Sequence, residues 1–204
     1  MRLFIIRHAE PEPLSDACPD EKRGLSPLGR EQAGRLPVAF AGVALDGVIS
    51  STMARAAETA APLVEALGLP LRREPKLSEI DLGSLMPWGP PERAQWDEVT
   101  ACWASGDLSL PCPDGESLTD VMARVEPVVE RLLGESWPQG LAIVGHAVVN
   151  SIVLWALCPE LASTVGQNLG HSHAGVWEIE GDGRSFRVVR RNDVSHLGTP
   201  ADAA

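Results

Sequence analysis

Short apolar segments alternate with amphipathic helical segments along this chain, and the alternation predicts an α/β fold. The length of 204 residues suits one domain, and the 44% of hydrophobic residues suffice for a core that needs neither disulfides nor a structural metal. We therefore expect a three-layer α/β/α sandwich with a mostly parallel central sheet. We expect a single domain over residues 1–204, with a small insertion at about residues 83–116.

The first half of the chain predicts strands and helices in alternation. An apolar, β-branched run opens the chain and gives way to a Pro-rich loop that extends to about Gly24. Ser26 as N-cap and Pro27 as the first helical residue begin a helix, and Gly68 is placed to end the next one. The expected elements, in order, are a strand at residues 2–6, a helix from 27 to about 41, a strand at 45–51, a helix at 53–67 and a strand at 69–73.

The second half predicts an insertion, further helices and a terminal hairpin. The insertion is rich in Pro, Gly and Trp and interrupts the alternation of strands and helices. Ser117 and Asp120 indicate a capping box, and the turn at residues 181–183 indicates a hairpin. The expected elements are a short helix at about 92–104, a helix from 117 to about 133, a strand at 141–144, a helix at 148–157, and hairpin strands at 176–179 and 185–190.

Charge and composition exclude several classes of partner. The net charge is −11 and the chain contains no basic run, which argues against nucleic acid and against anionic membrane surfaces. Only Lys22 and Lys76 are lysines among the 17 basic residues, and arginine offers the bidentate geometry that suits phosphate. A small anionic ligand held by a few local arginines is therefore compatible with the acidic balance.

The cysteines and the termini predict a cytoplasmic protein. None of the four cysteines forms a CxxC pair, so the sequence supports neither a zinc cluster nor a redox motif, and we expect free thiols. The apolar run at the N-terminus is too short for a signal peptide, and no stretch has the length of a transmembrane helix. The sequence does not fix the oligomeric state, so a homodimer stays open.

Polar residues follow the predicted strands where each strand ends. His8 follows the first strand, Arg55 lies four residues after the second, and His146 follows the strand at 141–144. Ligands of open α/β sheets bind at the carboxyl ends of the strands, so these groups should share one edge of the sheet. Each residue taken alone is more often structural or solvated, and only the convergence favours a site.

Phosphoryl transfer is the chemistry that suits such a cluster. A phosphate needs positive donors around its oxygens, which Arg7 and Arg55 can supply. A neutral imidazole can attack phosphorus in line, and a second histidine can donate to the equatorial oxygens as charge shifts. Positioning and charge stabilisation are the main contributions of a protein to this reaction.

Ordered segments throughout the chain together resemble the histidine phosphatase superfamily, also called the phosphoglycerate mutase-like family. Six motifs at plausible spacings are more specific than any one of them. The segments that carry the resemblance are LFIIRHA at 3–9, LSPLGREQA at 25–33, SSTMARAAETA at 50–60, LSEIDLG at 77–83, GESLTDVMAR at 115–124 and IVGH at 143–146.

The resemblance implies a role for each matching residue. His8 would be the nucleophile that becomes phosphohistidine, while Arg7, Arg55 and His146 would hold the phosphoryl group. Glu79 would be the general acid and then the base for the attacking water, with the nearby Asp81 in reserve. The resemblance implies no metal and no cofactor, and the substrate would be a small phosphorylated metabolite.

The chain departs from the family pattern next to the nucleophile. Ala9 replaces the signature glycine, so the backbone there must suit a residue with a side chain. Glu10, Pro11 and Glu12 stand where mutases carry neutral donors, and the two carboxylates would repel a highly charged diphosphoglycerate if they face the pocket. The segment after the acid, residues 83–89, is stretched by a proline relative to the family pattern.

A phosphatase is therefore the leading hypothesis, and two alternatives stay open. One is a phosphoglycerate mutase-type transfer, which the motifs do not exclude. The other is a catalytically silent protein on the same fold that binds a phosphorylated ligand.

The tryptophans of the insertion and two late histidines allow functional and structural readings. Trp88, Trp96 and Trp103 could form a lid over an apolar part of the substrate, but a small satellite core is favoured. His171 and His173 could suggest a metal pair or line the rim of the active site, but solvated loop histidines are favoured.

Overall fold

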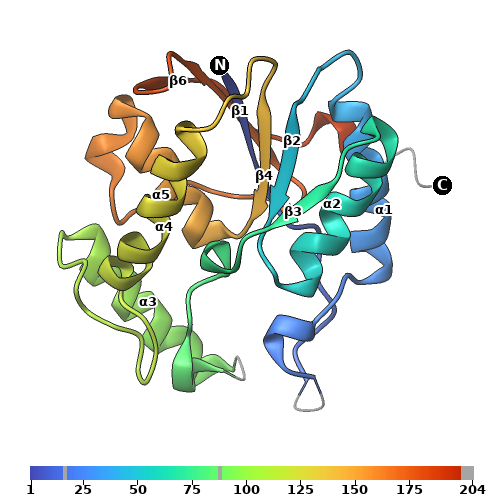
Figure 1. The fold of residues 1–204 in the computed structure, drawn as a ribbon. Coiled ribbons are helices and arrows are strands. Elements are labelled where there is room, and N and C mark those ends of the chain that lie inside the picture. Colours follow the sequence, from blue (N-terminus) through green and yellow to red (C-terminus); the bar gives the residue numbers. More distant parts are fainter. Residues whose placement is uncertain (16–17, 87–88, 199–204) are drawn as a thin grey trace.

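The computed structural model describes residues 1–15, 18–86 and 89–198, and it centres on one six-stranded sheet with the order β3-β2-β4-β1-β5-β6 (Figure 1). The pairings β3-β2, β2-β4 and β4-β1 are parallel, whereas β5 is antiparallel to both β1 and β6. This confirms the predicted α/β fold with a mostly parallel sheet. The strands are β1 (Arg2–Arg7), β2 (Gly47–Ser50), β3 (Leu71–Arg73), β4 (Leu141–Gly145), β5 (Val176–Gly181) and β6 (Phe186–Asp193).

Helices cover both faces of the sheet, which produces the three layers seen in Figure 1. One face carries α1 and α2, and the other carries α4 and α5. Helix α3 lies beyond the carboxyl ends of the parallel strands. The helices are α1 (Pro27–Ala39), α2 (Ala54–Leu67), α3 (Pro90–Ala104), α4 (Leu118–Leu133) and α5 (Ala147–Leu157). Short 3-10 helices are η1 (Asp20–Lys22), η2 (Pro75–Leu77), η3 (Gly83–Leu85), η4 (Pro159–Thr164) and η5 (Ser195–Leu197).

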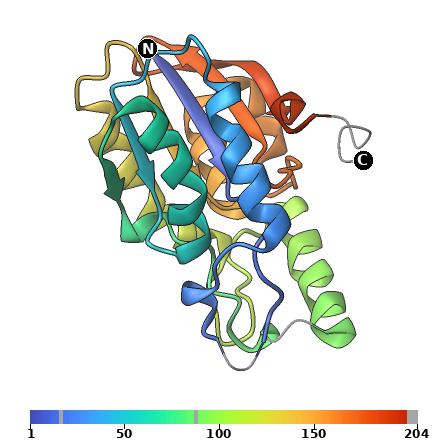
Figure 2. The ribbon, with the colours of Figure 1, turned by 90° about the vertical axis from the view of Figure 1, so that its right-hand side faces the viewer.

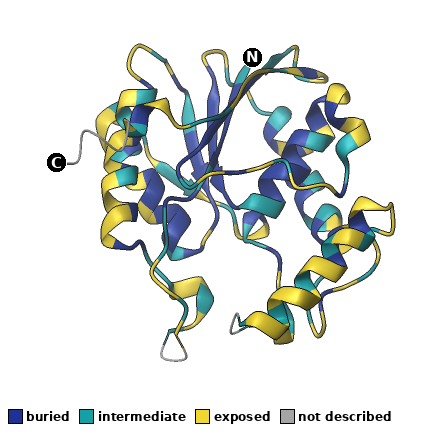
Figure 3. Cartoon of the chain, turned by 180° about the vertical axis from the view of Figure 1, so that it is seen from behind, coloured by how far each residue is buried: buried dark blue, intermediate teal, exposed yellow. Residues whose placement is uncertain are grey.

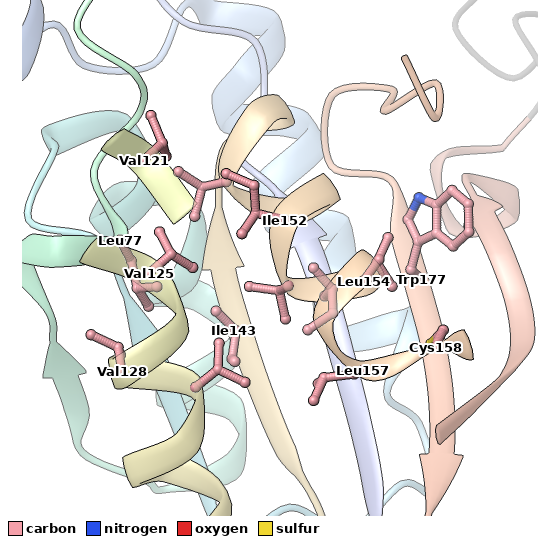
Figure 4. Close-up of a cluster of buried hydrophobic side chains, with 14 of the residues drawn as sticks. Leu77, Val121, Val125, Val128, Ile143, Ile152, Leu154, Leu157, Cys158 and Trp177 are labelled. Carbon is pink, nitrogen blue, oxygen red and sulfur yellow. The ribbon is translucent and has the colours of Figure 1, made fainter. Parts of the chain in front are cut away.

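The strands supply both cores because successive side chains point to opposite faces. In β1, Leu3 and Ile5 pack under α4 and α5, whereas Phe4 and Ile6 pack under α1 and α2. Figure 4 shows the larger core, in which the labelled valines of α4 meet residues of β4 and α5. Seen from behind in Figure 3, the strands are buried and the exposed residues lie on the outer sides of the helices.

The predicted helix signals act as expected. The predicted strands and helices differ from the observed ones at their ends, and the short 3-10 helices were not predicted. Ser26 caps α1 by accepting a hydrogen bond from Gly29 N, and Ser117 and Asp120 form the capping box of α4. Gly68 ends α2 in the left-handed conformation, with φ of 64°. Helix α1 ends at Ala39, earlier than expected, because Phe40 N already bonds to Pro37 O in a tightened last turn.

The insertion packs on the main core. Trp103 is buried, its indole nitrogen donates to Leu110 O at 2.8 Å, and its ring meets that of Trp96 edge to face at a centroid distance of 5.5 Å. Trp88 lies outside the described residues. We retain a single domain over residues 1–204, with an insertion at about 83–116, as a proposal.

The topology brings the ends of β1, β2 and β4 to one edge of the sheet, since these strands are parallel neighbours. Figures 1 and 2 show that α3 and the segment that holds η1 extend beyond this same edge. Among the described residues, no helix is both long enough and apolar enough to cross a membrane.

Candidate active site

His8 is held in a defined orientation directly after β1. It is 5% exposed, and its backbone N–H extends the sheet by donating to Gly145 O at 2.9 Å. The ring Nδ1 lies 2.7 Å from Ala9 O. A carbonyl oxygen can only accept, so Nδ1 carries the hydrogen and Nε2 keeps its lone pair. This is the tautomer that a nucleophilic imidazole needs.

His146 lies beside His8 at the start of α5, with 5.1 Å between the ring centroids. It is fully buried, and its Nε2 is 2.7 Å from Ser51 Oγ. That oxygen also accepts from Met53 N at 3.3 Å, and its own hydrogen can be donated to Nε2. In that arrangement Nδ1 carries the hydrogen of the imidazole, and Nδ1 has no hydrogen-bond partner among the residues that the structure describes. It can therefore donate to a phosphoryl oxygen.

Burial keeps both histidines neutral. Burial lowers the pKa of His8 well below its ordinary value of 6.5, and the proximity of His146 and of the charged Arg55 and Arg7 lowers it further. Burial likewise lowers the pKa of His146, helped by Arg55 and Arg7. At neutral pH, His8 is thus an uncharged imidazole rather than an imidazolium.

Arg7 and Arg55 supply the positive charge of the site. Arg55 is 3% exposed, and its guanidinium donates to Asp20 through Nη2, at 3.0 Å to the carboxylate, and through Nη1, at 2.9 Å to the backbone oxygen. Arg7 donates from Nη1 to His171 O at 2.6 Å. The Nε of each arginine is buried and has no hydrogen-bond partner within residues 1–15, 18–86 and 89–198. Both arginines therefore keep donors for an anion.

Glu79 belongs to the same electrostatic cluster. Its carboxylate accepts from Ile80 N at 3.2 Å and approaches Val148 N, in the first turn of α5, at 3.5 Å. Burial raises the pKa of Glu79 above its ordinary value of 4.5, against the opposing effects of the Ile80 N–H, Arg55 and Arg7. A carboxyl group that holds its proton toward neutral pH can act as a general acid.

An ion pair fixes the backbone that carries Glu79. Arg124 binds Glu116 at 2.7 Å and donates to Glu79 O at 3.1 Å, while Glu116 accepts from Asp81 N at 2.9 Å. The carboxylate of Asp81 instead accepts from Gly83 N at 2.9 Å, and Asp81 is exposed. The geometry therefore favours Glu79 over Asp81 as the acid.

The substitution at Ala9 is accommodated without strain. Ala9 is fully buried, its φ is not positive, and its N–H donates to Thr59 Oγ1 at 2.9 Å. A side chain at this position is therefore compatible with the loop that holds His8.

The carboxylates that follow Ala9 are engaged with α1. Glu10 accepts from Ser26 Oγ at 2.8 Å, and Glu12 is exposed, 3.9 Å from Arg30. In the structure, the Glu10 and Glu12 carboxylates thus contact Ser26 and Arg30. The sequence-based expectation that they repel a diphosphoglycerate therefore gains little support from their orientations.

The late histidines lie at the site rather than in solvated loops. His171 is 8% exposed, and its Nε2 is 3.1 Å from Ser151 Oγ. His173 is half-buried, and its ring centroid is 5.6 Å from that of His8. The expectation of solvated histidines was wrong, because the segment between η4 and β5 folds back over the end of β1. Within the described ranges, no group of three or more histidine, cysteine or acidic side chains could hold a metal ion.

Sequence reasoning placed the charged residues of the cluster but missed the groups that orient them. Ser51 stood within a quoted motif, yet a hydroxyl at the end of a strand carries no separate signal. Asp20 lies in the Pro-rich loop, 35 positions from Arg55, and nothing local links the two.

Comparisons with known proteins agree on one family. The model of the histidine phosphatase superfamily (branch 1) matches residues 3–194. Phosphoserine phosphatase 1 of Hydrogenobacter thermophilus is 28% identical over 204 residues, which cover 97% of this chain and 92% of that protein. The 2,3-bisphosphoglycerate-dependent phosphoglycerate mutase of a Chelativorans species is 32% identical over 161 residues, covering 74% and 77%. A solved mycobacterial glucosyl-3-phosphoglycerate phosphatase superposes with a TM-score of 0.76 at 26% identity, covering 94% and 98%.

Proposed function

The chain belongs to branch 1 of the histidine phosphatase superfamily and is a phosphoric monoester hydrolase, and from this premise we propose that it hydrolyses a small phosphorylated metabolite through a phosphohistidine at His8, without a metal. The observation that carries the proposal is the hydrogen bond from His8 Nδ1 to Ala9 O. It leaves Nε2 with its lone pair, on a ring that burial keeps neutral.

The first step transfers the phosphoryl group to the enzyme. His8 Nε2 attacks phosphorus in line and forms a P–N bond as the bond from phosphorus to the ester oxygen breaks. Glu79 gives its proton to the departing alkoxide, which leaves as an alcohol. Arg7, Arg55 and His146 donate to the phosphoryl oxygens, where charge is spread in the transition state.

The second step returns the enzyme to its starting state. The Glu79 carboxylate takes a proton from a water molecule, whose oxygen attacks phosphorus. The P–N bond breaks, inorganic phosphate leaves, and Glu79 is again protonated. The positive charges of Arg7 and Arg55 serve both steps, so the protein itself can supply the charge stabilisation that a metal supplies elsewhere.

Hydrolysis of p-nitrophenyl phosphate tests the nucleophile and the metal independence together. We expect phosphate release to persist in EDTA. When turnover is stopped rapidly, we expect to find an acid-labile phosphate on His8. His8→Ala should abolish both turnover and labelling. Undiminished turnover in that variant would reject the nucleophile assignment, and inhibition by EDTA with rescue by a divalent ion would reject metal independence.

A mutase-type transfer is a second candidate, favoured by the identity with the Chelativorans mutase. Incubation with 3-phosphoglycerate distinguishes the two: a phosphatase releases inorganic phosphate, whereas a mutase forms 2-phosphoglycerate. We expect phosphate release to dominate.

A further inference from the structure

A groove of about 710 Å³ adjoins the active site between α3 and α5. Its first wall is one side of α3, which contributes Trp96 and Thr100, one helical turn apart. Its second wall is the inner side of α5, where Val148, Ser151 and Trp155 recur at helical spacing. The loop at residues 166–168 closes the third side.

The groove begins where the ester bond would be cleaved. Arg7 and His171 of the candidate site line the groove, and so does Val148, whose N–H is 3.5 Å from Glu79 Oε2. A phosphoryl group held by Arg7 beside His8 would direct its ester oxygen toward Glu79. The organic part of the substrate would then extend along the groove.

The side chains of the groove suit a flat apolar body. Trp96 and Trp155 are half-buried and line the groove, as do the buried Trp103 and Leu118. Its polar lining residues include Arg93, Asp97, Gln167 and Asn168. The Trp155 indole N–H donates to Thr164 Oγ1 at 3.2 Å, which holds the ring in place. Fixed aromatic rings favour stacked or edge-to-face contacts with other rings.

The volume of the groove also suits a large leaving group. Pockets of about 300–1,000 Å³ enclose ligands the size of a drug molecule. The alcohol part of a short aliphatic ester has only a few heavy atoms, so it can contact little of the groove. A larger body can contact both walls at once.

We propose that this groove binds the leaving group and selects phosphomonoesters whose alcohol carries a planar ring over short aliphatic ones. The inference rests on the proposed function, because it assumes that the phosphoryl group lies beside His8. It assigns Trp155 and Trp96 as specificity-determining residues.

Two substrates with alcohols of similar acidity isolate the effect of the ring. We compare 2-(1-naphthyl)ethyl phosphate with ethyl phosphate, so that the chemical step changes little between them. We expect kcat/KM to be about tenfold or more higher for the naphthyl ester, as one or two aromatic contacts provide. Equal values of kcat/KM, or a preference for ethyl phosphate, would overturn the inference.

Two alanine substitutions test the assigned walls. Trp155→Ala should bring the ratio of the two kcat/KM values close to one, and Trp155→Phe, which retains a ring, should restore most of it. Trp137→Ala is the matched control, because Trp137 is also half-buried with one indole hydrogen bond, to Leu132 O, but contacts Gly47 at the opposite end of β2. Its ratio should match the wild-type ratio.

The outcomes separate this inference from the proposed function. Loss of labelling at His8 with every phosphoester would reject the proposed function. Normal labelling and turnover with no preference for the ring would reject only the role of the groove. If Trp155→Ala does not fold, Trp96→Ala on the facing helix makes the same test, and an unchanged ratio there would contradict the inference.

Discussion

At the residue scale, the Ser51 hydroxyl holds the ring of His146 through a hydrogen bond to its Nε2. Ser51 Oγ accepts from Met53 N and lies 2.7 Å from His146 Nε2, and as a donor to Nε2 it leaves the ring hydrogen on Nδ1. Ser51→Ala removes this hydrogen bond and should lower kcat by about 10- to 100-fold, since a buried polar partner contributes about 1–3 kcal/mol. Steady-state kinetics with ethyl phosphate would show this as a loss in kcat larger than any rise in KM. Ser51→Thr keeps the hydroxyl and should retain most activity, and a kcat equal to wild type in Ser51→Ala would contradict the assignment.

The proposed role of Glu79 as general acid leads to a second prediction, in which the effect of a substitution depends on the leaving group. Glu79→Gln cannot give a proton, so hydrolysis of ethyl phosphate should fall by about 10²- to 10⁴-fold, whereas p-nitrophenyl phosphate, whose phenolate leaves unaided, should be affected far less in the first step. In the wild type, activity on ethyl phosphate should decline as pH rises through the raised pKa of Glu79, because the acid is then ionised. The comparison uses kcat/KM, which reports the first step alone, because the second step also needs Glu79 and is common to both substrates. Equal losses of kcat/KM on the two substrates would argue against the role of an acid. Asp81→Asn is the matched control and should keep the wild-type profile.

At the scale of elements, the loop that holds η1 is bound to the site through Asp20, whose carboxylate and backbone oxygen both accept from Arg55. Asp20 binds Arg23 at 2.8 Å and the buried Arg55 at 3.0 Å. A fixed negative charge beside Arg55 opposes the binding of a phosphate dianion. Asp20→Asn should therefore tighten the binding of inorganic phosphate by about 3- to 10-fold, since removing one nearby charge changes the interaction by about 1 kcal/mol in a partly solvated site.

Competitive inhibition by phosphate measures this effect. Glu21→Gln changes the net charge equally on the same short helix but is exposed, so its inhibition constant should stay near that of wild type. A weaker inhibition by phosphate in Asp20→Asn would show that Asp20 mainly positions Arg55.

The elements themselves were largely predictable, and the reason is local. Ser26, Gly68 and the pair Ser117 and Asp120 mark helix ends through hydrogen bonds within a few residues, so sequence alone reveals them. The site was predictable as far as strand ends define it, which includes His8 and His146. The ion pair between Asp20 and Arg55 and the contact between the rings of His173 and His8 depend on long-range packing, which no local pattern encodes.

At the scale of the whole molecule, the five histidines couple folding to pH. Burial is the leading cause that lowers the pKa of each one, to about 4 for His171 and His173. In the unfolded chain they titrate near 6.5, so their contribution to stability is complete above that pH and is lost as pH falls toward the folded pKa. Glu79 acts in the opposite direction, because its raised pKa lets the folded state bind a proton as pH falls.

The net effect is a fall in the free energy of unfolding between pH 7.5 and 5.5. For the buried His171 alone, the loss by pH 5.5 should be about 1.4 kcal/mol, since the unfolded state is protonated and the folded state is not. The half-buried His173 should add a smaller loss because solvent screens it. Urea unfolding at pH 7.5, 6.5 and 5.5 measures the total, and His171→Asn should make the curve shallower by the share of that residue. A free energy of unfolding that stays constant over this range would show that the histidines are accessible to protons in the folded state.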